Sequence, residues 1–298
     1  MLWTKGRTRY RFTGIHATLV LLRRFAYPNR WADINKDLKR SVSQCSTLFN
    51  DLIEFLCLRF DSLLSWNTRL LTVKRMQYYA DCLGRAGCPL PGCWAFLDGT
   101  FRQSVRPWMF QEHLFSGHKR AHGYKFQGLA SPDGLMVHLA GPYEGSANDQ
   151  GMLNRTRLLD LLETQNRVAA NEGKGPFVIY ADGGYFMNDK SDVLIVPFVR
   201  TIQTEDELVF NHVMSKYRIV VEWAFGNITR YFKYIDYGKQ LKPFLQPVGS
   251  FYRVAVLLNN LFVCLYGCVT SSRFECQPPS MEQYVAETGY TWEEYVAI

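Results

Sequence analysis

Apolar residues recur at helical spacing through the first part of the chain. One series runs through residues 15–25 and a second through residues 48–60. A spacing near 3.6 residues is typical of amphipathic helices. Pro28 interrupts the first series, and glycines at 84 and 87 end the helical region. The pattern predicts an all-α module over residues 1–87.

The pattern changes after the punctuated linker Cys-Pro-Leu-Pro-Gly-Cys at 88–93. Short apolar or alternating runs replace the helical series and indicate strands. We expect strands at 94–97, 123–130, 135–140, 177–181 and 193–198, with helices at 152–162, 205–232 and 248–266. The fold class predicted for residues 88–270 is α/β: a mixed sheet flanked by helices. Residues 271–298 are expected to form an acidic C-terminal tail.

The chain has 298 residues, of which 47% are hydrophobic, so it can bury a sizeable core. Its net charge of +7 is placed unevenly: residues 1–40 contain ten Lys and Arg against two Asp, whereas residues 276–298 contain four Glu and no basic residue. A basic front suits a polyanionic partner such as nucleic acid, although a solvated face gives the same pattern. Five arginines of this region could contact DNA phosphates: Arg7, Arg9, Arg11, Arg23 and Arg24.

The eight cysteines follow no disulfide or zinc spacing, which favours free thiols in a reducing compartment. The start of the chain lacks the apolar run of a signal peptide. The most hydrophobic late segment, 251–266, is short and contains two asparagines, so we expect a buried helix and no membrane span. These features predict a soluble intracellular protein.

Three acidic residues stand in apolar surroundings. Asp98 and Asp182 each end an apolar run, and Glu222 lies inside another. An ionised carboxylate among buried groups is costly unless a cation or hydrogen-bond donors meet it. Carboxylates at the ends of buried strands commonly hold hard divalent metals. If the three converge, the chain is a metal-dependent phosphoryl-transfer enzyme.

Each acid also has a simpler interpretation. Asp98 and Asp182 could be turn carboxylates, and Glu222 could be the i,i+4 partner of Arg218. Asp149 is a secondary candidate metal ligand, but it could instead cap a helix.

Five blocks of sequence resemble the DDE endonuclease domain of PIF/Harbinger-type transposases and the host nucleases derived from them. The resemblance covers about residues 94–265. The blocks are Leu-Asp-Gly-Thr at 97–100, the basic segment at 116–127, Gly-Pro-Tyr-Glu-Gly-Ser-Ala-Asn-Asp at 141–149, Ala-Asp-Gly-Gly-Tyr at 181–185, and the segment from Phe210 to Gly226 that contains Arg218 and Glu222.

The resemblance implies a ribonuclease-H-like sheet and a catalytic triad of Asp98, Asp182 and Glu222. It implies that the triad holds Mg²⁺ or Mn²⁺, with two ions about 4 Å apart that activate the attacking water and stabilise the leaving oxygen. It also implies DNA as substrate, a separate Myb-like protein for site recognition, and a nuclear location. A homo-oligomer is a further expectation. One departure is Asn148, where the family usually has a histidine.

Basic residues near the predicted second strand, Lys119, Arg120 and Lys125, are expected to contact DNA phosphates, as is Arg218. The histidines at 113, 118 and 122 leave a zinc site as an alternative, although no further ligand completes it. At the level of the whole protein, the alternative is a domesticated, catalytically silent DNA-binding or adapter protein that retains the fold. A glycosidase with paired carboxylates is a third, weaker option.

Overall fold

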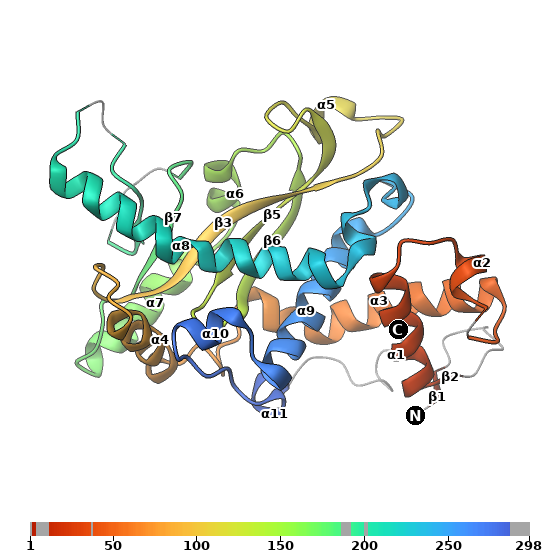
Figure 1. The fold of residues 1–298 in the computed structure, drawn as a ribbon, viewed down its shortest axis with the longest axis horizontal. Coiled ribbons are helices and arrows are strands. Elements are labelled where there is room, and N and C mark those ends of the chain that lie inside the picture. Colours follow the sequence, from red (N-terminus) through yellow and green to blue (C-terminus); the bar gives the residue numbers. More distant parts are fainter. Residues whose placement is uncertain (1, 4–11, 37, 186–191, 200–201, 287–298) are drawn as a thin grey trace.

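The computed structural model describes residues 2–3, 12–36, 38–185, 192–199 and 202–286. Arg7, Arg9 and Arg11 of the predicted basic front, and the end of the predicted tail at 287–298, lie outside this set. Figure 1 shows the arrangement: a twisted sheet with helices on both sides, and the N-terminal helices at one end of the molecule.

The sheet is mixed and is built around β3 (Cys93–Gln103). The antiparallel strand β5 (Ala121–Ala130) pairs with one edge of β3, and β6 (Met136–Glu144) pairs antiparallel with β5. On the other edge, β7 (Val178–Ala181) runs parallel to β3, and the two-residue β8 (Leu194–Ile195) runs parallel to β7. The short β4 (Phe115–Ser116) pairs with the start of β5. The predicted mixed sheet is therefore confirmed.

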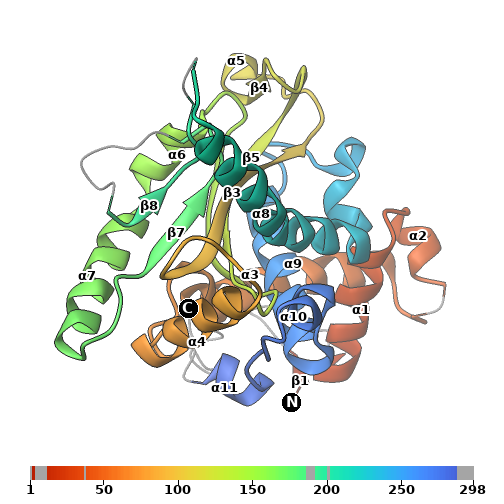
Figure 2. The ribbon, with the colours of Figure 1, turned by 60° about the vertical axis from the view of Figure 1, so that its left-hand side comes forward.

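Helices cover the sheet. The longest, α8 (Glu205–Tyr231), crosses the strands in Figure 1 and packs on β3 and β5. It begins with a capping box between Thr204 and Glu207. On the flank of the sheet that carries β7 and β8 lie α6 (Asp149–Arg155) and α7 (Leu158–Asn171), as Figure 2 shows.

The N-terminal helices share the hydrophobic cluster of the sheet. They are α1 (Gly14–Ala26), α2 (Trp31–Ile34), α3 (Val42–Ser65) and α4 (Val73–Arg85); a two-residue ladder of β1 (Leu2–Trp3) and β2 (Phe12–Thr13) precedes them. Helix α3 packs on β6 and α4 on β3, whereas α1 and α2 pack on α3. Fully buried Trp94 of β3 stacks on Tyr79 of α4, with ring centroids 6.3 Å apart, and meets Trp66 edge-on. Helices make up most of the described part of this region, although β1 and β2 do not fit an all-α module, and a separate N-terminal module stays a prediction.

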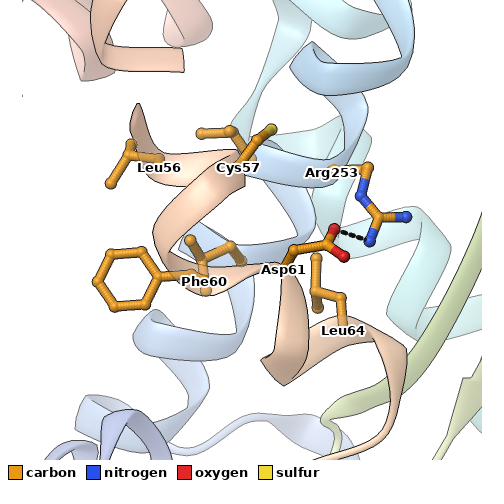
Figure 3. Close-up of a pocket in the computed structure, with 8 residues that line it drawn as sticks. Leu56, Cys57, Phe60, Asp61, Leu64 and Arg253 are labelled. Carbon is orange, nitrogen blue, oxygen red and sulfur yellow. Dashed lines mark hydrogen bonds and ion pairs between the residues drawn. The ribbon is translucent and has the colours of Figure 1, made fainter. Parts of the chain in front are cut away.

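Helix α9 (Val248–Tyr266) forms the centre of the helical layer. It is the one helix among the described residues that is long and apolar enough to cross a membrane, but most of it is buried in the core, where Asn260 bonds to the backbone of Met136 in β6. An ion pair between Asp61 of α3 and Arg253 of α9 ties the two helices together (Figure 3). The segment was predicted as a buried helix, and the structure agrees.

The segment after α9 also packs against the core in its described part. It contains α10 (Val269–Arg273) and α11 (Met281–Val285). Before α9, two 3₁₀ turns connect it to α8: η1 (Lys233–Asp236) and η2 (Gly238–Gln240). Tyr284 of α11 is buried, and its hydroxyl accepts a hydrogen bond from Asn260 at 2.8 Å. The short helix α5 (Gln111–Leu114) lies at the opposite end of the sheet.

Several boundaries differ from the sequence-based expectation. The single helix expected at 152–162 is two helices, because Thr156 adopts an extended backbone and its hydroxyl bonds to Leu153. The strand expected at 193–198 has two residues, and β3 continues six residues past Leu97. Arg24, considered for phosphate contact, is buried instead: it bonds to Asn29 and Gln240, and its guanidinium lies 4.2 Å from the Tyr234 ring centroid.

Candidate active site

Asp98 lies in β3, and Asp182 directly follows the neighbouring parallel strand β7. Leu97 of β3 is in register with Ala181, the last residue of β7, so the next residue of each chain segment is an aspartate. Asp98 lies inside β3 rather than at its end, since the strand continues to Gln103. Asp182 begins the turn after β7, closed by the amide of Tyr185 donating to its carbonyl at 3.1 Å.

The carboxylate of Asp98 is largely enclosed, with 19% of its side chain exposed. It accepts hydrogen bonds from the amide of Gly99 at 2.7 Å and from Nη1 of Arg218 at 3.0 Å. Its pKa is raised to about 6, mainly by burial and to a smaller extent by the nearby carboxylates of Asp182 and Asp149, while Arg218 and the Gly99 amide oppose the shift. Burial is thus the main cause of the raised pKa of Asp98, and the clustering of the acids is a smaller one.

Glu222 reaches the same region from α8. Its side chain is half exposed, and its carboxylate accepts from Nη2 of Arg218 at 2.9 Å. The i,i+4 pairing considered for Arg218 and Glu222 is thus observed. The same guanidinium also contacts Asp98, so one arginine bridges the two acids. Arg218 lies at the acid cluster and orients its carboxylates.

Asp149 is placed at the cluster by the start of α6. The helix cap is Asn148, whose side chain accepts from the amide of Gly151 at 2.6 Å, so the alternative that Asp149 caps the helix is wrong. Its carboxylate lies so close to Gly99 and Gly184 that a Cβ on either would approach it to 2.9 Å. Because those glycines adjoin Asp98 and the Asp182 turn, Asp149 lies near both acids.

Lys125 holds the loop that leads to Asp149. Its ammonium donates to the carbonyl of Ala147 at 2.6 Å and lies 3.8 Å from the Asp149 carboxylate. Lys125 was predicted as a phosphate contact; its position at the acids also gives it this structural role.

Two buried residues with polar groups, Gln127 and Tyr185, pack next to the acid cluster, and sequence reasoning missed both. Gln127 of β5 is fully buried; its amide nitrogen donates to the hydroxyl of Tyr185 at 3.1 Å and reaches the Asp149 carbonyl at 3.5 Å. Burial and the charge of Asp149 raise the pKa of Tyr185 above its ordinary value. Both residues fall inside the sequence blocks quoted above, but nothing in the local pattern indicated that they meet.

A cavity of about 530 Å³ opens beside the acids. Asp149 and Asp182 line it together with basic and hydroxyl side chains: Lys119, Lys125, His118 and Ser116. Lys119 therefore lies where a phosphate beside the acids would be contacted. Arg120 is exposed next to it, in a left-handed backbone conformation (φ 50°).

The donor chemistry of the cluster fits a hard divalent cation, because carboxylate oxygens are the ligands that Mg²⁺ prefers. Within the described residues, however, no three His, Cys, Asp or Glu side chains are spaced to hold a metal ion. That finding covers the histidines at 113, 118 and 122 as well. Between Asp98 and Glu222, the Arg218 guanidinium occupies the place of a cation.

Comparison with known proteins identifies the family. The family described as DDE superfamily endonuclease matches residues 97–260, which is more than half of the chain. The chain belongs to the DDE superfamily endonucleases. The match begins one residue before Asp98 and includes Asp149, Asp182, Arg218 and Glu222. No curated protein and no solved structure matches the chain.

Membership of the DDE superfamily endonucleases suggests a nuclease of the transposase kind, in a superfamily that generally uses divalent metals. The matched range contains β3 from Leu97 onward, the strands β4 to β8, α8 and most of α9. The N-terminal helices lie outside the match.

Proposed function

We propose that this chain is a divalent-metal-dependent DNA endonuclease of the PIF/Harbinger transposase type. Its catalytic carboxylates are Asp98, Asp182 and Glu222, with Asp149 as a further ligand. The proposal includes a ribonuclease-H-like fold. In support, the acids come from the first strand of the large sheet, from the end of its parallel neighbour β7 and from α8.

The observation that carries the proposal is the meeting of acids from four separate elements. Asp98 and Asp182 follow residues in register on parallel strands, the Asp149 carboxylate lies against Gly99 and Gly184, and Arg218 links Asp98 to Glu222. A cluster of like charges costs folding free energy, and such clusters are typical of functional sites. A stable fold alone does not require it.

Mg²⁺ or Mn²⁺, as a pair of ions, would be held by Asp98, Asp182 and Asp149 together with Glu222, whose carboxylate is paired with Arg218 in this structure. A bound divalent ion supplies charge neutralisation for the phosphate and a lowered pKa for an attacking water. Asp98 is protonated at mildly acidic pH, because its pKa is about 6, and must lose that proton before it serves as a ligand.

The basic side chains of the cavity would bind and orient the DNA backbone. Lys119 and Lys125 line the cavity beside Asp149 and Asp182, and Arg120 is exposed on the adjoining loop. Ammonium and guanidinium groups neutralise phosphates without reading sequence. For sequence specificity we therefore propose a separate Myb-like DNA-binding partner. We further propose a nuclear location and self-association of the chain.

Cleavage of supercoiled plasmid tests the proposal. We expect Mg²⁺- or Mn²⁺-dependent nicking by the intact chain, and a loss of at least about 100-fold in Asp98→Asn, because an amide is a poor ligand for a hard cation. The matched control is Asp33→Asn, which removes an exposed acid of α2 whose ion-pair partner is Lys36. Equal nicking by the intact chain and Asp98→Asn would overturn the proposal.

A catalytically silent DNA-binding or adapter protein is the second candidate. One observation favours it: the Arg218 guanidinium already neutralises Asp98 and Glu222 without any metal. Such a protein would bind DNA with the same affinity in EDTA and in Mn²⁺, and Asp98→Asn would not change that affinity.

A further inference from the structure

A second cavity, lined by aromatic rings, lies near the tip of the sheet. Its volume is about 310 Å³, at the small end of ligand sites. Four aromatic side chains from separate segments line it, together with two polar ones at its edge: Phe110, Tyr124, Tyr143, Phe244, His113 and Glu144. The proposed nuclease function uses none of these six residues.

Two of these rings are held in an unusual backbone conformation. Phe110 and Phe244 have φ of 53° and 63°, the left-handed region that bulky residues rarely adopt. Their ring centroids lie 5.9 Å apart, and both side chains remain more than half exposed. Strained residues of this kind gather at ligand clamps and active sites. Two exposed phenylalanines facing a hollow gain little burial in return for that strain.

The polar groups at the cavity suit a flat ring with hydrogen-bonding edges. Glu144 is an acceptor, held by Arg155 at 2.7 Å, and the hydroxyls of Tyr124 and Tyr143, whose pKa values burial raises, are hydrogen-bond donors. A nucleobase has aromatic faces for stacking and N–H groups for the carboxylate.

The aromatic cavity is connected to the candidate active site. The carbonyl of His113 accepts from the amide of Ser146 at 3.1 Å, in the loop that leads to Asp149. Ser116 and Lys119, a few residues after His113, line the acid cavity. Tyr124 and Lys125 are consecutive on β5, so their side chains point to opposite faces of the sheet. Lys119 and Arg120 lie in the chain segment between His113 of the aromatic cavity and Lys125 of the acid cavity.

We propose that the aromatic cavity binds an unpaired base of the DNA strand that flanks the cleavage site. The inference rests on the proposed nuclease function and names its substrate class: DNA with a single-stranded or locally melted stretch beside the cut. A paired base cannot enter a hollow without leaving the stack, so fully paired DNA binds only through its phosphates.

Binding of two DNA probes tests the inference. A short blunt duplex and the same duplex with a single-stranded 3′ overhang are compared by fluorescence anisotropy, using the full chain in EDTA so that no strand is cut. The overhang carries 2-aminopurine, whose emission falls when it stacks on an aromatic ring. The intact chain is expected to bind the overhang duplex about 10-fold more tightly and to quench the probe.

The test variants are Phe244→Leu, which keeps an apolar side chain, and the double variant Phe110→Ala with Phe244→Ala. Both should lose the overhang preference and the quenching while blunt-duplex affinity stays unchanged. The control is Tyr266→Ala, an exposed aromatic at the end of α9 that does not line the cavity. Equal binding of both probes by the intact chain would overturn the inference, and so would variants that weaken both probes alike.

The outcome can be separated from that of the proposed function. Metal-dependent plasmid nicking without an overhang preference contradicts the aromatic-cavity inference alone. An overhang preference without nicking contradicts the nuclease proposal alone. If a protein partner occupied the cavity instead, the phenylalanine variants would leave DNA binding unchanged, which also overturns the inference.

Discussion

Arg218 lies between two acids of the candidate active site, with Nη1 3.0 Å from the Asp98 carboxylate and Nη2 2.9 Å from that of Glu222. A guanidinium presents its donors in a planar fork, so one residue can hold two carboxylates in fixed relative positions. The arrangement stabilises the acid cluster without metal. It also makes Arg218 a competitor for any divalent ion that needs both carboxylates.

Arg218→Gln should therefore bind Mn²⁺ more tightly at pH 7.5, by about 10-fold, because the competing charge is gone. Without metal the same variant should unfold more easily, by about 1–3 kcal/mol, since Asp98 is left enclosed with fewer donors. Titration calorimetry and urea unfolding measure the two effects. Arg273→Gln, at an arginine that bonds to the Lys216 carbonyl, is the control. Weaker Mn²⁺ binding in Arg218→Gln would show that Arg218 is not a competitor.

Asp98 should make the metal-free protein less stable as pH rises. Its folded pKa of about 6 lies above the ordinary 3.8, so the folded state binds this proton more tightly than the unfolded state. The stabilisation is complete below about pH 4 and is lost as pH rises through 6. Between pH 5 and pH 7.5 the Asp98 contribution should fall by about 1–1.5 kcal/mol. Urea unfolding in EDTA should show this decline relative to Asp98→Asn; parallel pH profiles for the two proteins would contradict it.

Asp149 is expected to contribute as much to Mn²⁺ affinity as Asp182 does. Both carboxylates line the 530 Å³ cavity, and Asp149 is not occupied with capping its helix. Asp149→Asn should therefore weaken Mn²⁺ binding by at least about 10-fold, and Asp182→Asn should have an effect of the same size. Asp160→Asn on α7 is the matched control. If Asp149→Asn binds Mn²⁺ like the intact chain, Asp149 serves only to position Lys125 and its loop.

Tyr185 and Gln127 should be coupled in stability. Tyr185→Phe removes the hydroxyl that accepts from the fully buried Gln127 amide and should cost about 1–3 kcal/mol, because a buried donor is left without this partner. Gln127→Leu in the Tyr185→Phe background should recover part of that loss. A double-mutant cycle measured by urea unfolding gives the coupling free energy. Strictly additive effects would mean that the hydrogen bond does not support the acid cluster.

Much of the element pattern could be predicted from the sequence, because hydrophobic periodicity reports local burial. The boundaries of α9 matched the expectation, and those of α8 differed by one residue. The pattern was weakest at residues 152–162, where two helices have the same apolar spacing as one, and only the backbone of Thr156 separates them. The short β8 depends on pairing with β7, which local pattern does not contain.

Candidate site residues could likewise be predicted only where the local sequence marks them. Asp98, Asp182 and Glu222 could be selected because a carboxylate in an apolar run is locally anomalous. Arg24, selected for its charge, is buried against Tyr234, because helix α1 turns that face inward. Gln127 and Tyr185 carry no local anomaly at all; their importance arises from a contact across 58 positions of sequence.

The sequence by itself determined the types of element, the acids available and the family, since each of these is a local or linear property of the chain. Tertiary structure alone decided that the Asp149 carboxylate lies against Gly99 and Gly184, that Arg218 joins Asp98 to Glu222, and that two strained phenylalanines face one hollow. The physical reason is that these relationships are distances between remote segments, and strand pairing and helix packing set such distances only when the whole core forms.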